Sequence, residues 1–112
     1  MKKKSSFRVS DAFTKHLQDL SDRYGLSQAS TLELLIRKAG ADGPDRYMED
    51  RELRKMVKRD RDSSSPMDAS TFSLYRSTRE ILVEVADRYR VSMAEVMEVL
   101  VKAAVTGRLP VF

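Results

Sequence analysis

Residues 5–9 read SSFRV and residues 70–74 read STFSL, and in both stretches polar and apolar side chains alternate. Side chains of a β-strand point alternately to opposite faces, so this period predicts two strands with one buried and one exposed face each. A lone strand leaves its backbone hydrogen-bonding groups without partners. Because no other stretch has this pattern, we expect the two stretches to pair as a two-stranded antiparallel ribbon.

The two faces of the expected ribbon differ in character. One face is apolar and would pack against helices. The other face is polar and partly basic, with Lys4, Ser6, Arg8, Thr71 and Ser73 on it. A two-stranded ribbon fits the major groove of B-DNA, so the pattern indicates a DNA-binding protein.

Composition limits the class of protein. A chain of 112 residues has room for one domain with a modest core. Its 21 Lys and Arg against 17 Asp and Glu give a net charge of +4, which suits an anionic partner. The absence of cysteine excludes a disulfide framework and a thiolate metal site. No apolar run approaches the roughly 20 residues that span a bilayer, and the basic N-terminus lacks a signal peptide's apolar segment, so we expect a cytoplasmic protein.

A helical pattern follows the first strand. Apolar side chains recur at helical spacing over residues 11–24, with either Ser10 or Asp11 as the N-cap. Gly25 follows directly, where a left-handed residue is favoured, so we expect the helix to end there.

A second helix is expected to begin after Ser27 and to stop at Gly40 and Gly43-Pro44. The same order of strand and two helices returns after residue 70. There Ser92 would cap the second helix, and Glu95 three residues later would complete a capping box.

The two halves of the chain superpose without a gap when residue 5 is placed on residue 70, and we call this superposition the repeat alignment. Residues 22–24 (DRY), for example, fall on residues 87–89 (DRY). A match of this extent indicates one supersecondary unit used twice. Arg90 replaces Gly25, and because a left-handed residue other than glycine costs on the order of 1 kcal/mol, we expect this turn to differ.

The repeated unit of strand, helix and helix resembles the ribbon-helix-helix family of DNA-binding proteins, the class of the Arc and MetJ repressors. The resemblance rests on the alternating strand, the apolar stripe of the first helix and the capped second helix, which begins at Ser27 or Ser92. It covers residues 4–40 and 69–105, most of the chain.

The resemblance implies a mainly α fold with a two-stranded antiparallel β-ribbon. Members usually act as homodimers, so two units in one chain imply a tandem pseudo-dimer that is a monomer. The chain would be a single domain, 1–112, with repeats at 4–40 and 69–105, a linker with a helix at 41–68 and a tail at 106–112. A swapped assembly of two chains is the alternative.

The resemblance also implies that the outward strand positions read base edges: Lys4, Ser6, Arg8, Thr71 and Ser73. The chemistry agrees, because Arg can bond bidentately to guanine and Ser or Thr can donate or accept. Arg8 is the first candidate for specificity, at about 1–3 kcal/mol against a wrong base. The alternative is that Arg8 is simply an exposed strand residue.

The family clamps flanking phosphates with the N-termini of its second helices, where free N–H groups and the positive end of the dipole favour an anion. A basic arm beside the strand could follow the phosphate backbone as well. The residues expected at phosphates are Lys2, Lys3, Ser27, Gln28, Tyr75, Ser92 and Met93.

Alternative roles stay open for some of these residues. Capping alone would account for both serines, and Tyr75 could pack at the edge of the ribbon. Ser10 and Tyr75 stand where many members of the family carry proline. Glu95 would weaken the second clamp by its charge. Because the first strand is basic and the second neutral, we expect an imperfect or non-palindromic DNA site.

The linker is rich in charge. We expect one helix over residues 45–61 and a flexible joint at 62–66. The Arg- and Lys-rich end of the helix, residues 51–61, is either a solvated face or a second phosphate contact.

Together these features predict sequence-specific binding of double-stranded DNA. Tandem units of this kind resemble TraY-type accessory proteins of conjugation and a virulence accessory protein of T-DNA transfer. The expected role is therefore an accessory factor in plasmid or T-DNA transfer, or a transcriptional repressor, with plasmid maintenance or an antitoxin also open. Other DNA-transfer or regulatory proteins could be partners, and binding to DNA could be cooperative.

The alternative is a protein-interaction module, such as an antitoxin-like partner binder, which would use the linker helix and the apolar tail at 109–112. An enzyme is not expected, nor is a cofactor. His16 is the only histidine and would lie on the polar side of its helix, and the sequence contains no metal-ligand cluster, nucleophile motif or phosphate-binding glycine loop.

Overall fold

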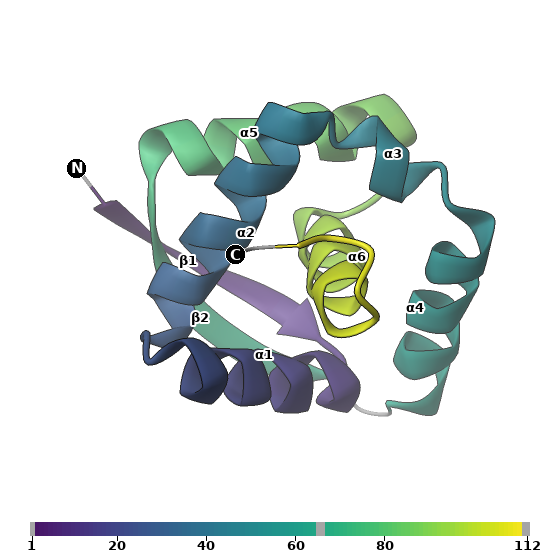
Figure 1. Ribbon diagram of the computed structural model, residues 1–112, viewed down its shortest axis with the longest axis horizontal. Helices are drawn as coiled ribbons and strands as arrows, with labels where there is room; N and C mark the ends of the chain where they lie inside the picture. The colour runs from purple at the N-terminus through teal and green to yellow at the C-terminus, as the bar shows by residue number, and fades with distance from the viewer. Residues whose placement is uncertain (1, 65–66, 111–112) are drawn as a thin grey trace.

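Two strand–helix–helix units follow one another along the chain, with two further helices between them (Figure 1). The computed structural model describes residues 2–64 and 67–110, without the side chains of Lys3 and Asp68. The elements are β1 (Lys2–Val9), α1 (Asp11–Tyr24), α2 (Gln28–Asp42), α3 (Asp45–Met48), α4 (Arg51–Ser63), β2 (Asp68–Tyr75), α5 (Arg76–Tyr89) and α6 (Met93–Val105). The expectation of a mainly helical fold with a two-stranded antiparallel sheet is confirmed.

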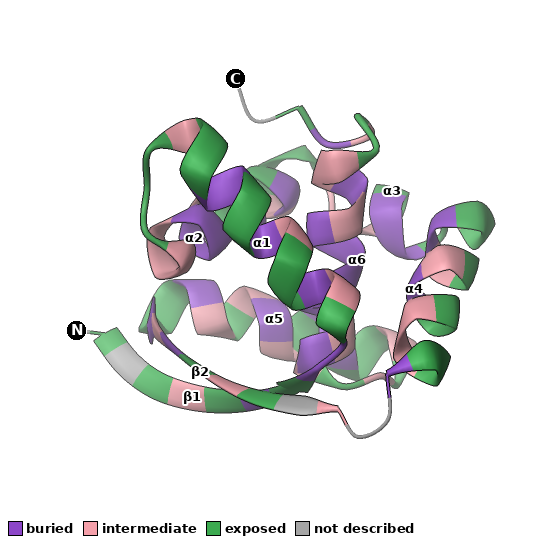
Figure 2. Cartoon of the chain, turned by 90° about the horizontal axis from the view of Figure 1, so that it is seen from below, coloured by how far each residue is buried: buried purple, intermediate pink, exposed green. Residues whose placement is uncertain are grey.

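The ribbon forms because its two strands carry the alternating pattern. β1 pairs antiparallel with β2, so that Lys2 lies opposite Tyr75. The helices lie on one face of this ribbon, and its other face is open (Figure 2). The four apolar residues expected on the inner face of the ribbon are buried beneath the helices: Phe7, Val9, Phe72 and Leu74.

Phe72 joins the ribbon to the helices. Its ring centroid lies 6.3 Å from that of Phe7 on the other strand. It also lies 6.3 Å from that of Phe13 on α1, in an edge-to-face arrangement. Aromatic pairs of this geometry contribute stability beyond the area that they bury.

The ends of α1 follow the capping signals. Ser10 is the N-cap of α1, and its hydroxyl accepts a hydrogen bond from the Phe13 backbone N–H. Gly25 ends α1 in the left-handed conformation, at φ 67°. The expectation that Arg90 would change this turn was wrong, because Arg90 takes the same conformation at φ 54°. Packing of the second unit therefore outweighs the local cost of a left-handed arginine.

Gly40 does not stop α2, contrary to expectation. The helix continues to Asp42, and Gly43 ends it at φ 99°. A Cβ atom at Gly40 would lie 3.2 Å from Cδ1 of Ile81 on α5. The missing side chain at Gly40 thus permits a close approach of two helices rather than a break.

α6 is the central helix of the molecule (Figure 1). It packs against β1 and against every other helix of the described chain. Most of its residues are apolar, and eight of its residues, including Glu98, are buried. This pattern is typical of a helix with neighbours on all sides. Leu109, in the expected tail, is also buried and covers the core after the end of α6. The other apolar tail residues, 111–112, lie outside the described residues.

The linker contains two helices where one was expected over residues 45–61. The first of these helices, α3, ends with Glu49 as its C-cap. The Asp50 carboxylate then accepts a hydrogen bond from the Leu53 N–H at 3.0 Å and caps the start of α4. Leu53 and Val57 are buried, and α4 packs against α1 and α6. The linker is therefore part of the core.

The flexible joint expected at residues 62–66 is wrong for the part that the structure describes. Asp62 and Ser63 belong to α4. Ser64 is buried, and its hydroxyl accepts a hydrogen bond from the Asp11 backbone N–H at 2.9 Å. The rest of the joint, residues 65–66, lies outside the described residues.

Two buried glutamates connect the units to each other. Glu98 of α6 accepts a hydrogen bond from the backbone N–H of Ser10 at 3.1 Å. Glu33 of α2 accepts one from the backbone N–H of Tyr75 at 2.6 Å. Each carboxylate therefore holds the N-cap residue of the first helix of the other unit, and the repeat alignment superposes Glu33 on Glu98. Sequence reasoning missed this role.

Each of these carboxylates also forms an ion pair with an arginine. Arg61 of α4 donates to Glu98. Arg37 donates to Glu33 at 3.3 Å, and the hydroxyl of Thr78 also bonds to Glu33. Burial nevertheless raises the pKa of Glu98 above its ordinary value, because desolvation outweighs the bonds from Ser10 and Arg61.

Within the described ranges, no helix combines the length and the apolar character needed to cross a membrane.

Candidate nucleic-acid interface

The open face of the ribbon brings together the five positions predicted to read bases. Antiparallel pairing places Lys4 opposite Ser73 and Ser6 opposite Thr71. The hydroxyls of Ser6 and Thr71 are hydrogen-bonded at 2.9 Å in the middle of the ribbon. Lys4, Ser6 and Thr71 are exposed, and Ser73 is partly exposed. This face can therefore present both hydroxyl and cationic groups to one ligand.

Arg8 lies toward one end of this face, opposite Ala69. Its side chain is exposed and has no hydrogen bond or ion pair with any residue that the structure describes. Sequence reasoning missed Ala69, because a methyl group gives no chemical signal. The register shows that Ala69 lies opposite Arg8 and shares the exposed face.

The other end of the ribbon has a different composition. The ammonium of Lys2 lies 4.9 Å from the ring centroid of Tyr75, and the guanidinium of Arg37 lies 5.5 Å from it. Both distances are within the range of cation–π attraction. The Tyr75 ring therefore packs against two cations while remaining 43 % exposed. The side chain of Lys3, also predicted at a phosphate, lies outside the described residues.

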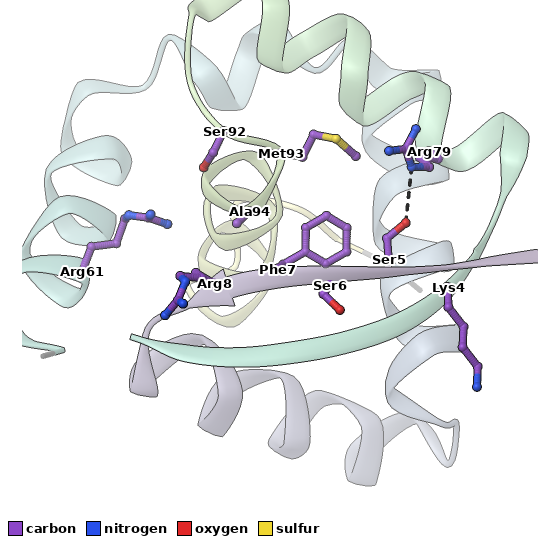
Figure 3. Close-up of a pocket in the computed structure, with 10 residues that line it drawn as sticks. All are labelled: Lys4, Ser5, Ser6, Phe7, Arg8, Arg61, Arg79, Ser92, Met93 and Ala94. Carbon is purple, nitrogen blue, oxygen red and sulfur yellow. Dashed lines mark hydrogen bonds between the residues drawn. The ribbon is translucent and has the colours of Figure 1, made fainter. Parts of the chain in front are cut away.

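A hollow of about 470 Å³ lies beside β1, between the strand and the N-terminus of α6 (Figure 3). Four cationic residues from three elements border it: Lys4, Arg8, Arg61 and Arg79. The Lys4 side chain points away from the hollow (Figure 3). Arg61 points from α4 toward Ser92 and Arg8 (Figure 3). Among the described residues, this hollow is where cations and the N-terminus of a long helix meet, which is a suitable environment for an anion.

Arg79 is the contributor from α5. Its Nε donates a hydrogen bond to the Ser5 hydroxyl at 3.3 Å. Ser5 faces the helices, so this bond holds the Arg79 side chain at the edge of β1. Arg79 was not predicted as a site residue, and Arg61 was considered only as the end of the segment 51–61, one interpretation of which was a second phosphate contact. Both come from helices whose position relative to the strand only the tertiary structure shows.

The N-terminus of α6 is built from Ser92 and Met93, as expected. Ser92 is exposed, and its hydroxyl accepts a hydrogen bond from the Glu95 N–H at 3.1 Å. The prediction of a full capping box was wrong, because the Glu95 carboxylate does not return to the start of the helix. It faces Arg54 at 3.4 Å and Arg61 at 4.0 Å instead. These two cations offset the charge that was expected to weaken this helix end as an anion site.

The N-terminus of α2 carries fewer charges. Ser27 is exposed and accepts a hydrogen bond from the Ser30 N–H at 3.1 Å. The Gln28 amide donates to the Gln18 side chain at 2.6 Å. The first turn of α2 has no acidic residue, so its free N–H groups can also receive an anion.

His16 was expected on the polar, exposed side of its helix, but the structure does not place it on an open surface. It lies in a narrow hollow between α1, α4 and α6, beside Asp60 and Lys102. Burial, with a smaller contribution from Lys102, lowers the pKa of His16 below its ordinary value. In the part of the chain that the structure describes, no group of three or more His, Asp or Glu side chains could hold a metal ion.

Comparisons of the chain with protein-family models, with curated proteins and with solved structures find no match. The candidate interface is therefore defined by geometry. It consists of the open ribbon face, the hollow beside β1 and the exposed N-termini of α2 and α6.

Proposed function

We propose that this chain binds double-stranded DNA with sequence specificity by inserting its ribbon into the major groove. The observation that carries the proposal is the open ribbon face, where Arg8 and Lys4 are exposed and have no ion pair within the described chain. Hydroxyls of Ser6, Thr71 and Ser73 lie between and beside them. Such a set can form directional bonds with the edges of base pairs.

We further propose that the chain is a single-chain ribbon-helix-helix pseudo-dimer. The register supports this, because Ser6 and Thr71 face each other and are also superposed by the repeat alignment. A two-fold axis through this pair would exchange the two units. The buried glutamates support it as well, because Glu33 and Glu98 hold equivalent residues of opposite units.

The resemblance of tandem units to DNA-transfer accessory proteins gives the proposed setting, plasmid or T-DNA transfer, with transcriptional repression as the other role. Both roles require the same act of binding a particular duplex.

Arg8→Ala is expected to lower the affinity for a preferred duplex by roughly 5- to 150-fold, which corresponds to the loss of one bidentate base contact. Binding to a scrambled duplex should change much less. The measurement is fluorescence anisotropy with both duplexes at one salt concentration.

Arg46→Ala is the matched control, because Arg46 is also exposed and unpaired among the described residues. It lies in α3, on the far side of the molecule from the ribbon (Figure 2). Equal losses in the two variants, or a loss that is the same on both duplexes, would show that Arg8 does not read sequence.

A further inference from the structure

We propose that the exposed basic face of α4 binds the DNA backbone on the β1 side of the ribbon, so that the protein grips the two backbones unequally. This inference rests on the proposed DNA binding and adds a second contact surface to it. The surface is called the α4 basic face below and consists of Arg51, Lys55, Lys58 and Arg59.

The α4 basic face is available to a ligand. All four side chains are exposed, and none has an ion pair within the described chain. They lie on the opposite side of the helix from Leu53 and Val57, which fix α4 to the core. A rigid helix therefore presents these charges, so their binding to an anion would not require the ordering of a loop.

The α4 basic face continues the hollow beside β1. A second hollow, of about 400 Å³, is lined by four cationic residues and two acidic ones: Arg54, Lys55, Lys58, Arg61, Asp62 and Glu95. Arg61 also lines the hollow beside β1, so the two hollows share one side chain. Cations thus follow one another from Arg8 on the ribbon, past the N-terminus of α6, to the outer side of α4.

The β2 side of the ribbon has no equivalent of this path. The repeat alignment places Lys4 on Ala69 and Arg8 on Ser73. It places Thr14 on Arg79, so the position in α1 that corresponds to Arg79 is neutral. No segment outside the two units corresponds to α4 on that side within the described ranges.

Duplex DNA carries a phosphate backbone along each side of the major groove. With the ribbon in the groove, the backbone beside β1 would meet Arg79 and the α4 basic face. The backbone beside β2 would meet mainly hydroxyls and the N-terminus of α2. The complex would therefore have a direction along the DNA, and phosphate contacts would extend farther on one flank.

The test uses the double variant Lys55→Gln/Lys58→Gln in the full-length chain. Each lost phosphate contact lowers the slope of log affinity against log salt by about 0.9, so the slope should fall by roughly 1.8. The preference for a selected duplex over a scrambled one should stay the same, because base contacts are unchanged. Hydroxyl-radical footprinting should show protection that extends farther on one flank for the wild type, and the variant should lose that extension.

The control double variant is Lys38→Gln/Arg46→Gln, which removes the same charge from exposed, unpaired positions of the described chain on α2 and α3. If both double variants lower the slope equally, the effect is one of net charge and the α4 basic face is not a contact. If the wild type binds a selected duplex with equal protection on both flanks, the inference fails while the proposed function stands. If the wild type binds no duplex, both fail.

Discussion

Phe72→Ala is expected to lower the free energy of unfolding by about 3–5 kcal/mol, the usual range for removing a buried phenylalanine. Phe72 is 7 % exposed and packs against Phe7 on β1 and Phe13 on α1. Alanine would remove both ring contacts and leave a cavity at the point where the ribbon meets the helices. Urea denaturation followed by circular dichroism measures the change.

Thr71→Ala is the control for this change, because Thr71 is the preceding residue of the same strand and faces solvent. Its loss should alter the free energy of unfolding by only about 0.5 kcal/mol, as expected at exposed sites. Similar losses for both variants would mean that the two faces of β2 are not buried and exposed as described.

Glu98→Ala is expected to lower the free energy of unfolding by on the order of 3 kcal/mol. Glu98 is 3 % exposed, and its removal would leave the Ser10 N–H without an acceptor and Arg61 with only the more distant Glu95 carboxylate, at 4.0 Å. The intact ion pair of Glu98 and Arg61 need not itself be strongly stabilising for the free energy of unfolding to fall by this amount. The cost arises because burial of the remaining partners is no longer compensated.

Glu52→Ala serves as the comparison for Glu98→Ala. Glu52 accepts a hydrogen bond from Arg108 at 2.9 Å, but its side chain is 75 % exposed. The exposed pair should contribute less than about 1 kcal/mol. A Glu98 variant as stable as the Glu52 variant would show that Glu98 does not connect the two units. Both are measured by the same denaturation experiment.

The parts of the fold that could be predicted from sequence are those that neighbouring residues determine. Alternation identified both strands, and serine and glycine identified helix ends such as Ser27 and Gly25. Gly40 shows the limit of such rules. Glycine is needed there because the helix approaches Ile81, which is distant in the sequence and belongs to the other unit. Asp50 was an available signal for the start of α4, since a capping aspartate three residues before buried Leu53 fits the usual pattern.

The candidate site was predictable in its ribbon positions and much less so around them. The alternation of the sequence placed Lys4, Ser6 and Arg8 on one face. From the sequence alone, however, we assigned both positive charges to the half of the DNA site contacted by the first repeat. The register instead places Lys4 and Arg8, both on β1, on either side of the central pair of Ser6 and Thr71. Arg61 and Arg79 reach the site through helix packing, which no local pattern encodes.

The most direct test of the central claim is to select duplexes from a random pool with the wild-type chain and then measure its affinity for the recovered sequence and for its scrambled version. The account predicts that one sequence is recovered, non-palindromic at its centre, and that it binds at least about 10³-fold more tightly than the scrambled duplex at the same salt concentration. Recovery of no common sequence, with equal affinity for every duplex, would contradict sequence-specific DNA binding by the ribbon and favour a protein-interaction module.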